Sequence, residues 1–114
     1  AAATRSLLEE AGSEGLGAVW DPANAFSEFG EEPEKGAAAL GPFLRHTHLK
    51  DERRPPDGKT PWPPVLPGRG DFPAARVLAW LQARGEDGWV SFEWEKRWHP
   101  EIEDPEVALP HFIR

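Results

Sequence analysis

The sequence predicts an α/β fold in which parallel strands alternate with helices along 114 residues. Three short runs, 16–21, 45–50 and 88–95, are apolar or alternating, which is typical of strands, and helical patterns lie between and after them. Repeated strand–helix units give parallel strands joined by right-handed crossovers. Polar residues also mark the carboxyl ends of the three runs, which are Asp21, His48 and Glu93. In parallel α/β proteins, that edge of the sheet is where functional sites form.

The chain is expected to begin with a helix over residues 1–12, because its leucines fall at helical spacing and Gly12 supplies a stop. Residues 16–21 form a short apolar run, which predicts a strand that is buried on both faces. Pro22 cannot donate a hydrogen bond to a sheet, so the strand is expected to end there in a turn. A polar loop is then expected over residues 25–32.

A second helix is expected over residues 33–44, with a proline in its first turn, where the missing N–H is tolerated. The strand at 45–50 follows, and its alternation places His46, His48 and Lys50 on one face. Three ionisable side chains on one face are a poor basis for an apolar core. They are well suited to placing ligands and a positive charge beside a binding site.

Residues 51–70 form a long proline-rich segment, a length that is usually functional or disordered in compact domains. Asp71 is the expected N-cap of a helix over 72–84, which has the widest apolar face of the chain. The third strand is expected over 88–95, and the Asp-Pro-Glu run at 104–106 predicts the start of a final helix.

The composition disfavours several classes of function. The net charge of −7 weighs against nucleic acid as the main partner, because such domains usually carry a basic surface. The absence of cysteine excludes a disulfide scaffold and a cysteine-ligated zinc site. No apolar run approaches the roughly 20 residues that cross a bilayer, so no membrane partner is expected and the cytoplasm is the default location.

Asp21, His48 and Glu93 together form a mixed oxygen and nitrogen donor set, which suits Mn²⁺, Co²⁺, Zn²⁺, Fe²⁺ or Mg²⁺. Neighbouring strands about 4.8 Å apart can bring such side chains to a single ion. Structural roles stay open, because Asp21 can stabilise a turn and His48 can be a buried, hydrogen-bonded histidine. His46 is expected to pack or to support a ligand, and Glu95 to be solvated or paired with a neighbouring basic residue.

Four motifs resemble the xylose isomerase-like TIM-barrel superfamily, which includes sugar and sugar-phosphate isomerases and epimerases, inosose dehydratases and endonuclease IV-type nucleases. The motifs are Val19–Asn24, His46–Asp51, Gly68–Pro73 and Gly88–Glu95. The resemblance implies that residues 1–114 are one domain, equivalent to the last three βα units of a (β/α)8 barrel. A complete barrel takes about 250 residues. We therefore expect a partial barrel. Two ways to complete it stay possible, which are assembly into a homo-oligomer with further copies of the chain and association with a complementing N-terminal half.

Members of that superfamily hold one divalent metal with a Glu, an Asp, a His and a Glu from the last four strands. The resemblance implies that Asp21, His48 and Glu93 are the last three ligands, with the first Glu before residue 1. Glu93 would also act as one catalytic acid/base, with the first Glu as the other. Arg54 matches an arginine that contacts the substrate in several isomerases. The expected substrate-binding residues are Asn24, Lys50, Arg54 and Trp62.

The implied function is a divalent-metal-dependent isomerase or epimerase that acts on a sugar or sugar phosphate by proton transfer through an enediolate. An inosose-dehydratase-like lyase on the same scaffold is an alternative, as is an inactive chain that lacks the first ligand Glu and serves a structural or binding role. A nuclease is disfavoured because Asn24 stands where those enzymes place a His, and because the loop before Gly68 lacks an Asp-x-His pair.

Overall fold

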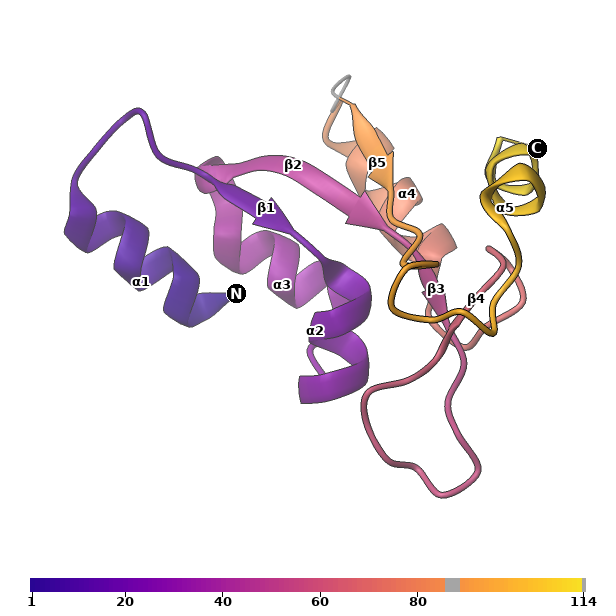
Figure 1. The fold of residues 1–114 in the computed structure, drawn as a ribbon. Coiled ribbons are helices and arrows are strands. Elements are labelled where there is room, and N and C mark those ends of the chain that lie inside the picture. Colours follow the sequence, from indigo (N-terminus) through magenta and orange to yellow (C-terminus); the bar gives the residue numbers. More distant parts are fainter. Residues whose placement is uncertain (86–88, 114) are drawn as a thin grey trace.

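The computed structural model describes residues 1–85 and 89–113. The fold is built around a three-stranded parallel sheet (Figure 1). The strands, in their spatial order, are β1 (Ala18–Trp20), β2 (Leu44–Leu49) and β5 (Val90–Phe92). Both strand pairs are parallel, and the register sets Trp20 beside Thr47 and His48 beside Ser91. The prediction of a mixed α/β fold with parallel strands is therefore confirmed.

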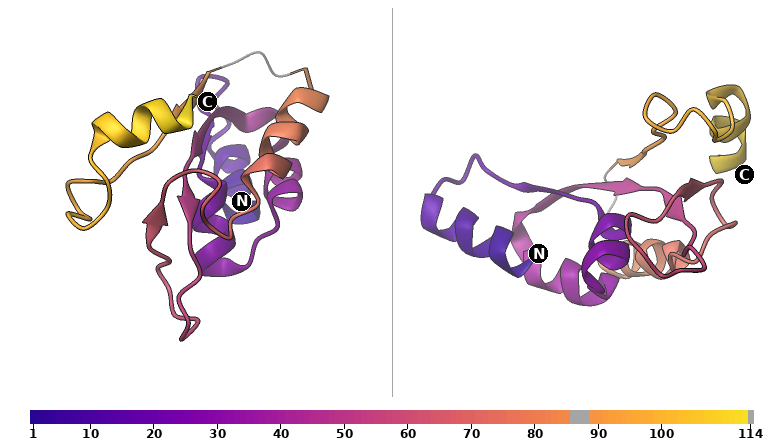
Figure 2. Two further views of the ribbon diagram at one scale, coloured as in Figure 1. Left: turned by 90° about the vertical axis from the view of Figure 1, so that its right-hand side faces the viewer. Right: turned by 60° about the horizontal axis from the view of Figure 1, so that its bottom comes forward.

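Helices precede, connect and follow these strands. Their bounds are α1 (Ala2–Ala11), α2 (Pro22–Phe29), α3 (Pro33–Leu40), α4 (Ala74–Ala83) and α5 (Pro105–Phe112), and a 3₁₀ turn, η1 (Gly41–Phe43), leads into β2. Figure 2 shows α2, α3 and α4 gathered along one side of the sheet. Within the described part of the chain, every helix is too short or too polar to span a membrane.

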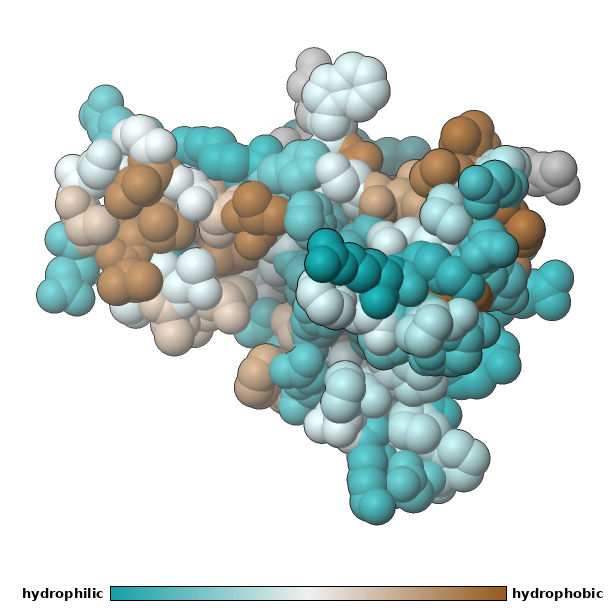
Figure 3. All heavy atoms as spheres, in the orientation of Figure 1, coloured by the Kyte–Doolittle hydropathy of each residue, from teal (hydrophilic) through white to brown (hydrophobic). Residues whose placement is uncertain are grey.

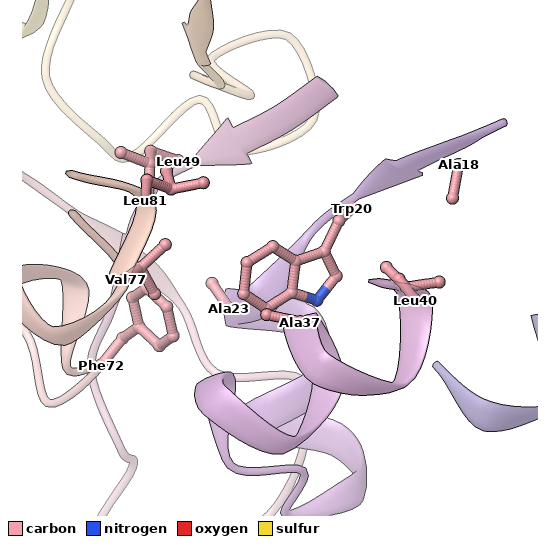
Figure 4. Packing of buried hydrophobic residues seen from close by; sticks show 9 residues of the cluster. All are labelled: Ala18, Trp20, Ala23, Ala37, Leu40, Leu49, Phe72, Val77 and Leu81. Atoms are coloured by element: carbon pink, nitrogen blue, oxygen red, sulfur yellow. The ribbon is translucent and has the colours of Figure 1, made fainter. Parts of the chain in front are cut away.

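The hydrophobic core lies between this side of the sheet and the helices. The indole of Trp20 points from β1 towards Ala23, Ala37 and Leu40 on α2 and α3 (Figure 4). The other buried members are Ala18, Leu49, Phe72, Val77 and Leu81. Full burial of a valine, leucine or phenylalanine side chain contributes about 1.5–3 kcal/mol to stability relative to leaving it exposed. This core fixes β1 and β2 against the helices and so positions the residues at the strand ends.

The opposite side of the sheet is less covered. The side chain of Val19 alternates with those of Ala18 and Trp20 and is 61% exposed. The prediction that this strand is buried on both faces is therefore wrong, because α2 and α3 pack on only one face of β1. Apolar side chains consequently reach the surface over α1, the α1–β1 connection and β1 (Figure 3).

Residues 25–32 were expected to form a loop, but most of them belong to α2. The Oδ1 atom of Asp21 accepts a hydrogen bond from the Asn24 backbone N–H at 2.9 Å, and Pro22 occupies the first helical position. Gly30 closes the helix with a φ of 65°, a conformation that favours glycine. The Asp-Pro pair therefore begins a helix here, where a turn was predicted.

The other helices differ from the predictions at their ends. α3 ends at Leu40 instead of residue 44, because Gly41 takes a φ of 53° and the chain turns into η1. The prediction that Asp71 caps α4 is wrong, since the helix begins at Ala74 after Pro73. The Oδ2 atom of Asp71 instead accepts the Arg54 backbone N–H at 2.9 Å.

The proline-rich segment contains a short antiparallel pair of strands, β3 (Asp51–Glu52) and β4 (Pro64–Val65). The buried Asp51 carboxylate holds the segment closed, since it accepts the backbone N–H of Glu52 at 2.9 Å and that of Gly70 at 2.8 Å. β5 is shorter than the strand predicted over 88–95, of which Gly88 lies outside the described residues. The final helix begins at Pro105, as predicted.

Candidate active site

Three strand ends bring the predicted residues to the same edge of the sheet. Asp21 directly follows β1, His48 is the penultimate residue of β2, and Glu93 directly follows β5. The Glu93 backbone N–H donates to the Leu49 carbonyl at 2.9 Å, which extends the pairing beyond β5. The parallel register and the order β1–β2–β5 therefore place β2 and its side chains between the two carboxylates.

The ammonium of Lys50 lies at the centre of this edge. Its Nζ atom is 3.2 Å from Asp21 Oδ2 and 3.3 Å from Glu93 Oε2. It is also 3.4 Å from Glu95 Oε2 and 3.8 Å from Glu52 Oε1. Only 3% of the Lys50 side chain is exposed. We refer to Asp21, Glu52, Glu93 and Glu95 as the carboxylate cluster.

The electrostatics of the carboxylate cluster favour cations. Burial lowers the pKa of Lys50, but the charges of Asp21 and Glu93 outweigh this effect and raise the pKa to about 12. Burial raises the pKa of Glu52, although the neighbouring Ser27 hydroxyl and Lys50 oppose the rise. One ammonium thus faces four carboxyl groups.

Two carboxylate oxygens in the cluster lack hydrogen bonds. The Oε2 atoms of Glu52 and Glu93 are buried and accept no hydrogen bond from the described residues. Among the described residues, Glu93 Oε2 has only the ion-pair contacts with Lys50 and His48, at 3.3 and 3.6 Å. Buried oxygen atoms without a hydrogen bond are costly, so the cluster has capacity for a further positive group. Carboxylates of this kind are the ligands that hard divalent cations prefer.

The two histidines occupy different positions beside the cluster. His48 Nδ1 lies 3.6 Å from Glu93 Oε2, and about a third of its side chain is exposed. His46 is farther from the strand end, with its Nε2 atom 2.7 Å from the Ser91 hydroxyl and its ring edge-on to His48 at 5.6 Å. His48 is thus the imidazole next to Glu93, and the ring of His46 packs edge-on against the ring of His48.

The donor set of Asp21, His48 and Glu93 suits a divalent metal, although residues 1–85 and 89–113 contain no ready-made group of three or more His, Asp and Glu side chains for one. The Lys50 ammonium lies between the two carboxylates. Metal–oxygen bonds of about 2.0–2.2 Å are shorter than the 3.2 and 3.3 Å at which these carboxylates contact Lys50 Nζ. The residues therefore fit a metal by their chemistry, and Glu93 Oε2 is a buried oxygen that such an ion would satisfy.

The residues predicted to bind substrate are not all close to the cluster. Asn24 contacts the cluster, because its Nδ2 atom donates to Asp21 Oδ2 at 2.7 Å and orients that carboxylate. Trp62 is half-buried and packs edge-on against Phe26 at 5.8 Å. Arg54 is exposed in the segment after β3, and its backbone N–H donates to Asp71.

The sequence analysis missed two members of the cluster. Glu95 was expected to be solvated or to pair with a neighbouring basic residue, but its carboxylate pairs with Lys50. Glu52 was not considered at all. A signal existed for both, since Glu95 lies two residues beyond Glu93 and Glu52 two residues beyond Lys50, which is the spacing of side chains that share a face.

Comparison with known proteins agrees with this architecture. A family model described as the xylose isomerase-like TIM barrel matches residues 1–112. The chain belongs to this family. No match was found among curated proteins or among solved structures. The family recognised from the four sequence motifs is therefore confirmed.

Proposed function

We propose that this xylose isomerase-like protein is a divalent-metal-dependent isomerase or epimerase of a sugar or sugar phosphate, and that its sheet corresponds to the last three βα units of the barrel. The observation that carries the proposal is that Asp21 and Glu93 meet at the buried Lys50 ammonium, with His48 beside Glu93, at the carboxyl edge of parallel strands. In parallel barrels that edge is where the chemistry takes place.

Asp21, His48 and Glu93 would hold the metal ion, with Asn24 keeping the Asp21 carboxylate in position. The ion would supply Lewis acidity to a substrate carbonyl and offset negative charge on its oxygen atoms. Glu93 is the proposed acid/base: a carboxylate oxygen takes the proton from the carbon next to the carbonyl. In an isomerisation the proton returns to the former carbonyl carbon while the hydroxyl proton passes to the former carbonyl oxygen, and in an epimerisation a proton returns to the same carbon on the opposite face. Loss of that proton gives the substrate the character of an enediolate.

Cationic side chains would position the substrate oxygens. The Lys50 ammonium lies 3.3 Å from Glu93 Oε2, so a substrate oxygen beside Glu93 also lies near a strong donor. Arg54 is exposed in the adjoining segment, and its planar guanidinium suits a sugar phosphate. Trp62 offers an aromatic face of the kind that packs on the C–H surface of a sugar.

Proton transfer at carbon can be followed directly by NMR. The purified protein is incubated with Mn²⁺ and a panel of aldoses, ketoses and their phosphates in D₂O, and then freed of Mn²⁺ for measurement. We expect deuterium to enter the carbon next to the carbonyl of one substrate, together with its isomer or epimer. The Glu93→Gln variant should lose this exchange by at least about a hundredfold, which is the usual contribution of an acid/base group.

The matched control is Glu101→Gln, because Glu101 has an exposed side chain paired with His99 away from the cluster. Its exchange rate should equal that of the unmodified protein. Absence of exchange with every substrate, or equal loss in both variants, would contradict the proposal. A product lighter by one water molecule would instead identify a lyase.

A further inference from the structure

We propose that Lys50 is a tethered counter-ion that holds the carboxylate cluster together in the metal-free protein and competes with the incoming divalent cation for the same oxygen atoms. Lys50 thereby sets the metal affinity of the site. The inference rests on the proposed function, since it concerns the same metal ligands. It assigns to Lys50 a role distinct from substrate binding.

The first argument is geometric. Lys50 Nζ makes its shortest carboxylate contacts with Asp21 Oδ2 and Glu93 Oε2, at 3.2 and 3.3 Å. These residues are two of the three proposed metal ligands. An ion bound to both carboxylates would therefore claim oxygen atoms that the ammonium already contacts, so the two cations compete for them.

The second argument concerns burial. The Lys50 side chain is 3% exposed and that of Glu52 is 5% exposed, so water screens their charges little. Without a cation, the carboxylates of the cluster would repel one another in a poorly solvated site. The Lys50 ammonium, which directly follows β2, supplies the missing charge at no translational cost, because the chain itself carries it.

The third argument concerns reversibility. Lysine is a point charge on a flexible four-carbon stem, so its ammonium can withdraw from a site without moving the backbone. By linkage, if the ammonium weakens metal binding by some factor, bound metal weakens the hold on the ammonium by the same factor. Competition therefore predicts two independent observables: metal affinity and the accessibility of Lys50.

The first test measures Mn²⁺ binding by isothermal titration calorimetry in the unmodified protein, in Lys50→Met and in Lys59→Met. Methionine keeps an unbranched stem of similar size and removes the charge. Lys59 is the matched control, because its side chain is 80% exposed and pairs only with the nearby Asp57 in the described structure. We expect Lys50→Met to bind Mn²⁺ at least about tenfold more tightly, since a unit charge and a divalent ion a few ångströms apart repel strongly. Lys59→Met should match the unmodified protein.

The outcomes separate the two proposals. Equal or weaker Mn²⁺ binding by Lys50→Met, with clear binding by the unmodified protein, would overturn the competition and leave the metal site standing. No binding by either protein would overturn both. Binding by Lys50→Met alone would support the competition in its strongest form, with the ammonium excluding the metal.

A second measurement covers the case in which Lys50→Met does not fold, and it uses the unmodified protein. Lysines are acetylated briefly with and without Mn²⁺, and the modified sites are quantified by mass spectrometry. Lys50 should react far more slowly than Lys59 without metal, and Mn²⁺ should raise its rate severalfold relative to Lys59. An unchanged or slower reaction of Lys50 in Mn²⁺ would overturn the inference.

Discussion

Replacing Gly70 by alanine tests how the proline-rich segment holds the site. A Cβ atom at this position would overlap the Asp51 carboxylate, whose Cγ lies 2.7 Å away, and the Glu52 carbonyl oxygen. Neither group can yield easily. Asp51 is 2% exposed and accepts the Gly70 N–H at 2.8 Å, while the Glu52 carbonyl accepts the Asp71 N–H, also at 2.8 Å.

The expected cost follows from these contacts. A hydrogen bond to a charged, buried acceptor contributes about 1.5–3 kcal/mol, and forcing extra atoms into a packed site costs about 1–3 kcal/mol. Gly70→Ala should therefore lower the free energy of unfolding by roughly 3–5 kcal/mol. Because Asp51 directly follows Lys50, the same displacement should weaken divalent-cation binding at the carboxylate cluster.

Urea unfolding at 25 °C, followed by tryptophan fluorescence, measures this loss, since Trp20 is in the core and lies edge-on to Trp80 at 6.3 Å. Gly15→Ala is the control, because the nearest atom to a Cβ there is the Ser13 hydroxyl oxygen at 3.7 Å. The control should stay within about 0.5 kcal/mol of the unmodified protein. Equal urea midpoints for Gly70→Ala and Gly15→Ala would refute the reasoning.

Three further substitutions test the core, the α2 cap and the buried acid. Leu40→Ala removes a side chain that is 2% exposed and should cost about 2–5 kcal/mol in urea unfolding, whereas Leu7→Ala, at 66% exposure, should cost little. Asp21→Ala removes the side-chain cap of α2 and should cost at least about 0.5–2 kcal/mol, more than Asp104→Ala, whose side chain makes no cap hydrogen bond. The raised pKa of Glu52 means that the folded protein holds this proton more tightly than the unfolded chain, so stability falls as pH rises above about 4.5. Glu52→Gln should therefore raise the urea midpoint at pH 7 and flatten its pH dependence, and an unchanged profile would contradict that sign.

Local patterns were sufficient to predict the sheet. The alternation at 45–50 and the polar residues at the strand ends established parallel strands with Asp21, His48 and Glu93 at one edge. The start of α2 was misread because an Asp-Pro pair suits both a turn and the first turn of a helix, and the choice depends on the Asp21 side chain accepting the Asn24 N–H.

The burial of Lys50 could not be predicted in the same way. Alternation placed its side chain on the face of the histidines, but its low exposure depends on carboxylates that follow β1 and β5 and on one within β3. The contacts with the carboxylates after β1 and β5 join residues far apart in the sequence. The exposure of Val19 is a second example, because it depends on which face of the sheet the helices cover.

The most direct test of the account is a crystal structure of the protein grown with Mn²⁺, with an anomalous difference map calculated from data collected above the manganese absorption edge. The account predicts one anomalous peak within about 2.0–2.3 Å of carboxylate oxygens of Asp21 and Glu93 and of an imidazole nitrogen of His48. It also predicts that the Lys50 ammonium has moved away from those oxygen atoms. A manganese peak that touches none of these three side chains would contradict the account. So would a crystal grown with Mn²⁺ that shows no manganese peak at all.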